Sequence, residues 1–333
     1  MNRYVIKYFL NFWFLFLLIL ALFLTPSFYS NIPLIFAIGP SLLNLNTIFL
    51  SILIEALPFV LIGVLIAGFI QIFITEDHIQ KWIPKNKLMA VIMSCIVGAL
   101  FPACECGIVP IVRRLISKGV PIHAAMGFML TGPLINPIVI VSTYMAFGND
   151  AKIAGLRMIL GFLFAIIIAL IISFTFKGTQ FKQGIHINKS YAHTEKLPFN
   201  KKCSHMLTHS IDEFFDMGKY LIIGAFLAAF VQTFLSTKTL VNIGNDLSSS
   251  LFVMMALAYI LSLCSEADAF IGASFSSIFP SPAILAFLIF GPMIDFKNTI
   301  MMLGVFRIKF VLWLLVIVFA VVFTLLWLAA PYI

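Results

Sequence analysis

The chain is dominated by apolar runs that are each long enough to cross a lipid bilayer. A spanning helix needs roughly 20 mostly apolar residues. Only 10% of the 333 residues are charged and 62% are hydrophobic, whereas a soluble domain carries about 25% charged residues. This excludes a soluble enzyme, a nucleic-acid-binding protein and a disordered chain, and predicts an all-α polytopic integral membrane protein. The apolar runs lie near 8–25, 47–74, 88–112, 122–147, 153–176, 214–236, 250–279, 280–296 and 303–330.

The basic residues predict the orientation of the chain in the membrane. The stretch 177–213 is the only long polar segment and carries six lysines, so the positive-inside rule makes it a basic cytoplasmic linker. Arg3 and Lys7 precede the first run, which we interpret as a membrane helix with a cytoplasmic N-terminus followed by an outer loop (1–46). The net charge of +8 therefore indicates membrane topology and not nucleic acid as a partner.

The count of crossings predicts that one run does not cross. If all four runs between 47 and 176 crossed once, the basic linker would lie outside. The best candidate is 88–118, which we expect to enter from the cytoplasm, turn and return, because irregular backbone at that depth is tolerated where protein or water covers it. Its interruption and its basic end are made by Pro102, Gly107, Pro110, Arg113, Arg114 and Lys118.

Two stretches of the chain indicate an internal repeat. A shift of 161 residues aligns 54–75 with 215–236 and gives six identities, and a shift of 159 aligns six more, including Gly132-Pro133 with Gly291-Pro292. The topology places the two copies, 47–176 and 214–333, in opposite orientations, as in many secondary transporters. The second copy has its own broken segment at 263–268. We expect about eight membrane segments, namely seven crossings and two opposed re-entrant hairpins, with the next inner loop marked by Lys297, Arg307 and Lys309.

Three carboxylates lie in these broken apolar segments: Glu105, Glu266 and Asp268. An acidic group at the bilayer centre costs roughly 2.5–3.5 kcal/mol on insertion scales. One interpretation is cation contact or proton coupling, in which a poorly solvated carboxyl group loads and releases a proton. The alternative is that these side chains bond to backbone amides at the helix breaks and only hold the hairpins together.

Three cysteines accompany the carboxylates. Cys104 and Cys106 flank Glu105, and Cys264 occupies the corresponding turn of the second copy. Thiolates bind soft ions such as Cu(I), so three convergent sulfurs would make a soft-ligand cage. The alternative is that these cysteines are small residues that pack well.

Gly107 and Asn136 complete the candidate site. Gly107 and Pro110 are expected to open the returning half-helix, whose amides carry partial positive charge toward the turn, although proline at a first turn is also ordinary helix-start chemistry. Gly132-Pro133 and Asn136-Pro137 are expected to break the following helix, where Asn136 would line a path.

The blocks Pro102-Ala-Cys-Glu-Cys-Gly-Ile-Val-Pro110 and Cys264-Ser-Glu-Ala-Asp268 resemble those of the predicted permease family that includes the organoarsenical efflux permeases. The resemblance covers about 47–325. It implies a multi-pass permease of the bacterial inner membrane, with export of thiophilic trivalent organoarsenicals known for some members. Certain Gram-positive relatives look like one subunit of a two-component complex, so the resemblance leaves a second membrane subunit open.

The sequence therefore predicts a secondary permease for efflux of a small solute or ion, and not an enzyme. No nucleotide-binding motif and no zinc-ligand spacing of the strong kind occurs, so no cofactor or metal is expected and the proton-motive force is the expected drive. Two alternatives stay open, a non-transporting subunit of a permease complex and a membrane thiol oxidoreductase, although the thiols lack a C-x-x-C spacing. The predicted midplane site is formed by Cys104, Glu105, Cys106, Gly107, Asn136, Cys264, Glu266 and Asp268.

Overall fold

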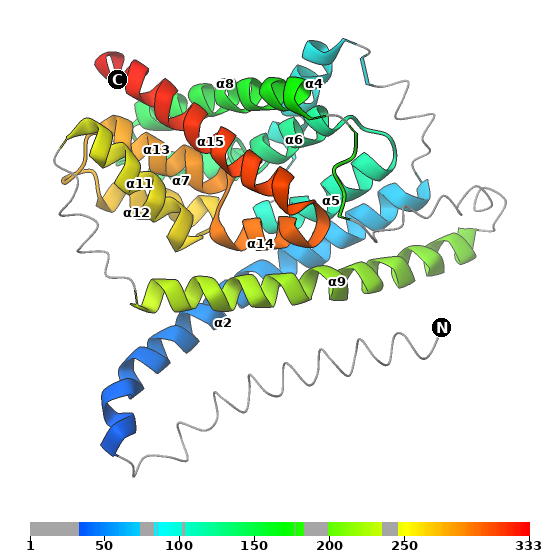
Figure 1. The fold of residues 1–333 in the computed structure, drawn as a ribbon, viewed down its shortest axis with the longest axis horizontal. Coiled ribbons are helices and arrows are strands. Elements are labelled where there is room, and N and C mark those ends of the chain that lie inside the picture. Colours follow the sequence, from blue (N-terminus) through cyan, green and yellow to red (C-terminus); the bar gives the residue numbers. More distant parts are fainter. Residues whose placement is uncertain are drawn as a thin grey trace.

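The protein is a bundle of α-helices (Figure 1). The computed structural model describes residues 33–73, 83–84, 86–101, 104–176, 178–182, 199–234 and 246–333. The first half contains α2 (Pro33–Phe73), α4 (Lys87–Leu100), α5 (Glu105–Ser117), α6 (Ile122–Thr131), α7 (Pro137–Ala146) and α8 (Ala151–Thr175). The second half contains α9 (Phe199–Phe234), α11 (Leu247–Leu261), α12 (Ser265–Ser274), α13 (Ser281–Met293), α14 (Phe296–Val305) and α15 (Ile308–Ala329), followed by a short 3-10 helix, Ala330–Tyr332.

Five stretches among the described residues are long and apolar enough to cross a membrane, and they confirm the predicted all-α polytopic class. The first apolar run, 8–25, lies outside the described residues. The predicted boundaries at 46, 176 and 213 remain interpretations of the sequence. The five stretches are Ser41–Phe73, Ala151–Thr175, Lys201–Phe234, Ser281–Val305 and Ile308–Tyr332.

The two halves contain helices in the same order and with corresponding packing. In the first half α4 packs on α6 and α6 on α8, while in the second half α11 packs on α13 and α13 on α15. The paired long helices run in opposite directions: α2 against α9 and α8 against α15 (Figure 1). The arrangement agrees with the inverted repeat that the sequence predicts.

Both predicted broken segments are interrupted in the structure. α4 ends at Leu100 and α5 begins at Glu105, while α11 ends at Leu261 and α12 begins at Ser265. Ser262 at the second break has a left-handed backbone conformation with φ of 46°. The half-helix α5 begins at Glu105, two residues before Gly107, where the sequence predicted its start. Cys104 is its N-cap, and Gly107 and Pro110 lie inside the helix.

The following helices are also interrupted, at Gly132 in the first half as predicted, whereas Gly291 and Pro292 lie inside α13, which ends only at Met293. α6 ends before Gly132, and Asn136 caps α7 by accepting a hydrogen bond from the Ile138 amide at 2.9 Å. In the repeat, Asp295 caps α14 by accepting from the Asn298 amide at 2.5 Å. Each half therefore offers two pairs of helix ends in the interior.

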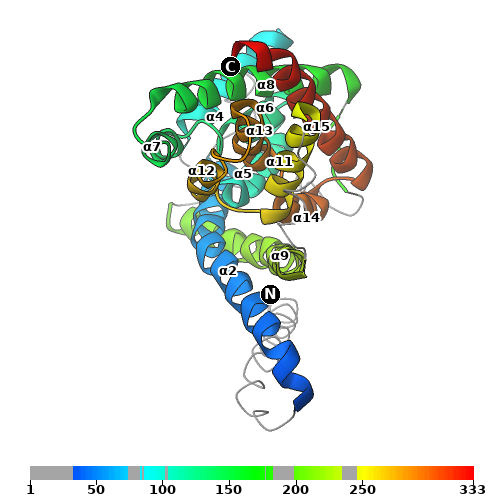
Figure 2. The ribbon, with the colours of Figure 1, turned by 90° about the vertical axis from the view of Figure 1, so that its left-hand side faces the viewer.

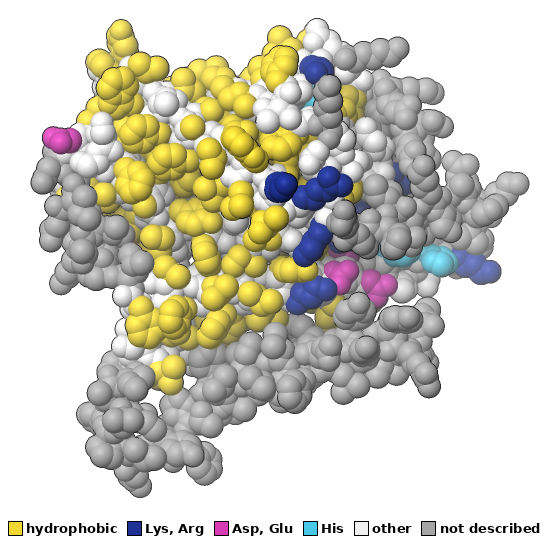
Figure 3. All heavy atoms as spheres, viewed as in Figure 1, with side chains coloured by type: hydrophobic (Ala, Val, Ile, Leu, Met, Phe, Trp, Pro, Cys, Tyr) yellow, Lys and Arg dark blue, Asp and Glu magenta, His cyan; other side chains and the backbone are white. Residues whose placement is uncertain are grey.

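α13 forms the centre of the bundle. Twelve of its thirteen residues are buried, and Figure 2 shows it among α8, α11, α12 and α15. The surface carries exposed apolar side chains such as Ile54, Phe174 and Trp313, and Figure 3 shows one broad face on which apolar side chains predominate. Such a surface suits contact with lipid, and it shields an interior where the polar helix ends meet.

Basic side chains gather at one end of the molecule (Figure 3). The backbone of 180–182 pairs with that of 305–307, with Arg307 donating to the Gln180 carbonyl at 3.0 Å and Lys182 donating to the Val305 carbonyl at 3.1 Å. This pairing joins the start of the basic linker to the basic start of α15. The cytoplasmic location of this end stays a prediction from the sequence.

Candidate functional site

A buried ion pair joins the start of α5 to α14. Glu105, the first residue of α5, is 2% exposed and its Oε1 lies 3.3 Å from Lys297 Nζ. The Lys297 ammonium also donates to the Ser262 carbonyl at 3.2 Å and lies 3.7 Å from Asp295 Oδ2. Helix starts from both halves of the molecule therefore share one cation.

The expectation that Lys297 marks an inner loop is wrong. Its side chain is only 4% exposed, whereas Arg307 and Lys309 are exposed. Lys297 is the second residue of α14, and it turns inward because Glu105 and Asp295 neutralise its charge. A lysine within an apolar stretch is expected to face a carboxylate in this way when it is buried.

A second buried cation, Arg157 on α8, holds the start of α12. Its guanidinium is 2% exposed and donates to Thr143 Oγ1 at 2.7 Å and to the Ser265 carbonyl at 3.2 Å. Asp268 and Glu266 are the carboxylates whose charges act on it. Arg157 was not among the predicted site residues, although an arginine in the middle of an apolar run is a usable signal.

Asp268 is buried without hydrogen bonds to its carboxylate. It is 1% exposed, and neither oxygen has a hydrogen-bond partner among the described residues. A Cβ atom on Gly291 would lie 2.9 Å from Asp268 Oδ2, so the glycine of the predicted Gly-Pro break gives this carboxylate its room. A carboxylate buried in this way is costly unless a cation compensates it.

The thiols form two groups and not one cage. Cys104 and Cys106 are hydrogen-bonded to each other beside Glu105 and Lys297, while the Cys264 thiol is hydrogen-bonded to Glu55 on α2. Among the described residues, no three His, Cys, Asp or Glu side chains are arranged to hold a metal ion. Convergence of the three sulfurs stays a prediction, and in this conformation the two cysteine-capped half-helices pack on different neighbours, α5 on α2 and α12 on α7.

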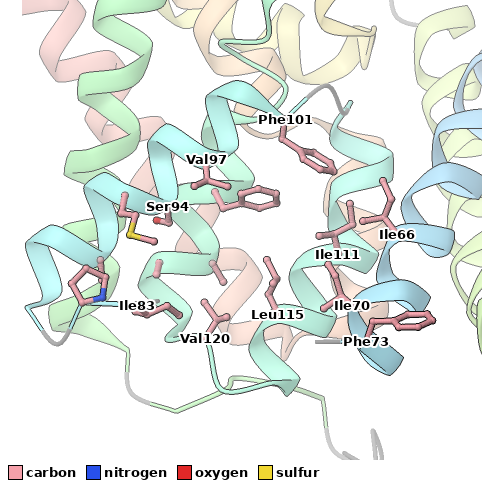
Figure 4. A pocket seen from close by; sticks show the side chains of 16 residues that line it. Ile66, Ile70, Phe73, Ile83, Ser94, Val97, Phe101, Ile111, Leu115 and Val120 are labelled. Atoms are coloured by element: carbon pink, nitrogen blue, oxygen red, sulfur yellow. The ribbon is translucent and has the colours of Figure 1, made fainter. Parts of the chain in front are cut away.

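An apolar cavity of about 520 Å³ lies beside α5 (Figure 4). It is lined by residues of α2, α4, α5 and α6, including Ile66, Val97, Phe101, Ile111 and Leu115. The lining contains none of the predicted site residues. The cavity is therefore separate from the polar cluster.

Comparison with known proteins places the chain in a family. The family model described as "Predicted permease" matches residues 41–329. The chain belongs to the predicted permease family. The permease is 52% identical over 283 residues to the UPF0718 protein YcgR of Bacillus subtilis, covering 85% of this chain and 95% of that one.

Two further relatives of the permease are more distant. A Streptococcus mutans protein named as a subunit of a two-component membrane permease complex is 43% identical over 272 residues, covering 82% of this chain and 90% of that protein. A UPF0718 protein of Methanocaldococcus jannaschii is 27% identical over 148 residues, covering 44% of this chain and 40% of that one. No solved structure matches the permease. The resemblance to the predicted permeases is thus confirmed.

The permease brings together most, but not all, of the predicted site residues. Cys104, Glu105 and Cys106 lie with Lys297, and the partly buried Glu266 lies with Asp268 near Arg157. The charge of Glu105 also acts on Cys264, which is the N-cap of α12.

Gly107 and Asn136 have structural roles in the permease. A Cβ atom on Gly107 would lie 2.7 Å from the Phe59 carbonyl oxygen, so this glycine allows α5 to approach α2. The Asn136 side chain is 4% exposed and serves as the cap of α7. Neither observation supplies a contact for a solute.

Proposed function

We propose that the permease is a secondary transporter for a small thiophilic cation, and that Cys104, Glu105 and Cys106 form its binding site. One observation carries the proposal. Two hydrogen-bonded thiols and a carboxylate begin a buried half-helix of one repeat, beside a lysine of the other repeat. Thiolate sulfur is the preferred ligand of soft ions such as Cu(I). Cys104, Glu105 and Cys106 are not arranged as an ion site in this conformation, so we propose that they converge when such an ion enters.

The position of this site supports transport. Secondary transporters built from inverted repeats bind their solutes near the midplane, where helices are discontinuous. Here both half-helices that start with a cysteine cap, α5 and α12, begin in the interior. The chain has no nucleotide-binding motif of the P-loop type, so we propose that the proton-motive force drives efflux, with Glu105, Glu266 and Asp268 as candidate coupling groups.

A second membrane subunit is a further part of the proposal. The Streptococcus mutans relative named as a subunit of a two-component permease complex covers 82% of the chain. We propose that this permease also works with a partner in the membrane. Purification in mild detergent from a native membrane should then recover a second membrane protein in fixed ratio, and transport should require both.

The transport proposal is tested by solute accumulation in a host stripped of exporters. Cells expressing the permease are compared with Glu105→Gln and Cys104→Ala variants at matched abundance in the membrane, for arsenic, copper, silver and a panel of other solutes. We expect the permease to lower the content of one thiophilic solute and both substitutions to abolish the effect. Cys203→Ala is the control, because Cys203 lies on α9 away from the cluster.

Two outcomes would contradict this proposal. If the substitutions leave accumulation unchanged while the permease lowers it, the thiols and Glu105 are not the binding site. If no solute moves even with the partner subunit present, the role as a non-transporting subunit becomes the better account. Efflux and uptake are separated by repeating the measurement in inverted membrane vesicles, where an exporter accumulates its substrate.

A further inference from the structure

Lys297 neutralises the charge of Glu105, but one oxygen of this carboxylate still lacks a hydrogen bond. The ammonium lies 3.3 Å from Glu105 Oε1 and 3.7 Å from Asp295 Oδ2, whereas charge-assisted hydrogen bonds of this kind usually measure about 2.7–2.9 Å. Glu105 Oε2 and Asp295 Oδ2 have no hydrogen-bond partner among the described residues. The lysine is therefore held loosely, and oxygen atoms beside it are available to another cation.

A second carboxylate is available to the same lysine. Both oxygens of the buried Asp268 lack hydrogen-bond partners in the described part of the chain. Lys297 and Arg157 are the cations whose charges act on Asp268. Because neither oxygen of this carboxylate accepts a hydrogen bond, an ammonium group that left Glu105 would be attracted to Asp268 even with Arg157 nearby.

The charges of the cluster leave room for one more cation. Three buried carboxylates, Glu105, Asp268 and Asp295, face two buried cations, Arg157 and Lys297. The difference, three minus two, is one negative charge. When all three carboxylates are ionised, one monovalent cation makes this buried set neutral, and one proton on a carboxylate does the same.

We propose that Lys297 is a built-in substitute for a cationic substrate. It pairs with Glu105 while the site is empty, and an entering monovalent cation takes over Glu105, so that the ammonium moves to Asp268. This inference rests on the proposed function and names the charge of its substrate. Glu105 and Lys297 belong to different repeats. The exchange of partners therefore breaks a contact between the repeats when the cation binds. The conformations with and without this contact then have different affinities for the cation.

The test measures binding of Ag⁺ to the full-length protein in lipid nanodiscs, in chloride-free buffer. The dissociation constant and the midpoint of thermal unfolding are compared for the wild type and Lys297→Met. We expect the variant to be less stable without Ag⁺ and to bind Ag⁺ about tenfold or more tightly, because a competing charge has been removed. Saturating Ag⁺ should then raise its midpoint more than that of the wild type.

A lysine with only a structural role predicts a different result. Lys297→Met would then be less stable, but its affinity for Ag⁺ would be unchanged or weaker, which would overturn the proposal. Lys297→Arg keeps the charge and should bind Ag⁺ as the wild type does. If Lys297→Met does not fold, Lys297→Gln replaces it, because an amide can still donate to the Ser262 carbonyl.

Two further variants test the exchange of partners. Asp268→Asn removes the second carboxylate and should weaken Ag⁺ binding about tenfold, because the displaced ammonium then has only Asp295 to share as a buried negative charge; an unchanged affinity would overturn the exchange. Glu213→Gln is the matched control. It removes a buried carboxylate that pairs with Arg113 and Arg114, and it should leave Ag⁺ affinity unchanged.

The double variant Cys104→Ala with Lys297→Met separates this inference from the proposed function. If the tighter binding of Ag⁺ persists without Cys104, the thiols are not ligands and the proposed site fails, while the role of Lys297 stands. If wild-type binding depends on Cys104 and Lys297→Met leaves it unchanged, the role of Lys297 fails and the thiol site stands. If Lys297→Met binds no Ag⁺ at all, both are overturned.

Discussion

At the scale of single residues, two buried cations define the polar interior. Arg157, from the first repeat, donates to the carbonyl of Ser265, which is the first residue of α12. Lys297, from the second repeat, pairs with Glu105, which is the first residue of α5. Each repeat therefore contributes a cation that fixes the start of the half-helix in the other repeat.

Arg157→Met is expected to destabilise the protein by about 3–5 kcal/mol, because it removes the cation beside the buried Asp268. The free energy of unfolding in detergent micelles measures the effect. Lys309→Met is the matched control, since Lys309 is exposed and exposed substitutions usually change stability by about 0.5 kcal/mol or less. Equal stability of the two variants would show that Arg157 does not compensate Asp268.

At the scale of elements, the position of α5 depends on close packing against α2. A Cβ atom on Gly63 would collide with the Gly107 carbonyl, and one on Gly107 would lie 2.7 Å from the Phe59 carbonyl oxygen. Two glycines therefore allow the two helix backbones to touch. This contact holds α5 while the Arg113 and Arg114 side chains at its far end pair with Glu213 on α9.

Gly107→Ala is expected to lower the free energy of unfolding by about 1–3 kcal/mol, because the methyl group forces α2 and α5 apart. The matched control is Gly155→Ala on α8. A Cβ atom there meets nothing within 4 Å, so this change should stabilise the protein by about 0.5–1 kcal/mol through helix propensity. Unfolding midpoints of the two variants should therefore shift in opposite directions, and a stabilised Gly107→Ala protein would contradict the close contact.

At the scale of the whole molecule, two antiparallel repeats enclose one polar cluster. The paired long helices run in opposite directions (Figure 1), and basic side chains gather at one end (Figure 3). From the positive-inside rule we predict that this end lies in the cytoplasm. The turn at 148–150, which joins α7 to α8, then lies on the outer side.

This orientation is tested by labelling introduced cysteines with a membrane-impermeant maleimide. Asn149→Cys should react in intact cells, whereas Lys309→Cys should react only after the membrane is permeabilised. The wild type, with its free native cysteines, gives the background. The reverse pattern of labelling would invert the proposed topology and place the basic linker outside.

The sequence alone determined the class of the fold and the positions of its interruptions. Apolar runs, prolines and glycines predict helices and breaks because these signals act locally, through hydrophobic length and backbone geometry. They located the breaks before α5 and α12 and the break at Asn136-Pro137 before α7. The matching pairs of residues also revealed the repeat.

Only the tertiary structure decided which residues face one another. The sequence predicted that Lys297 lies in a loop. Its charge is instead compensated in the interior by Glu105, which lies 192 positions away in the chain. The Cys264 thiol forms a hydrogen bond with Glu55 and not with Cys104, because each cysteine-capped half-helix is positioned by the neighbour on which it packs. Ion pairs and thiol contacts depend on the distance between atoms in space, and local sequence patterns do not contain that information.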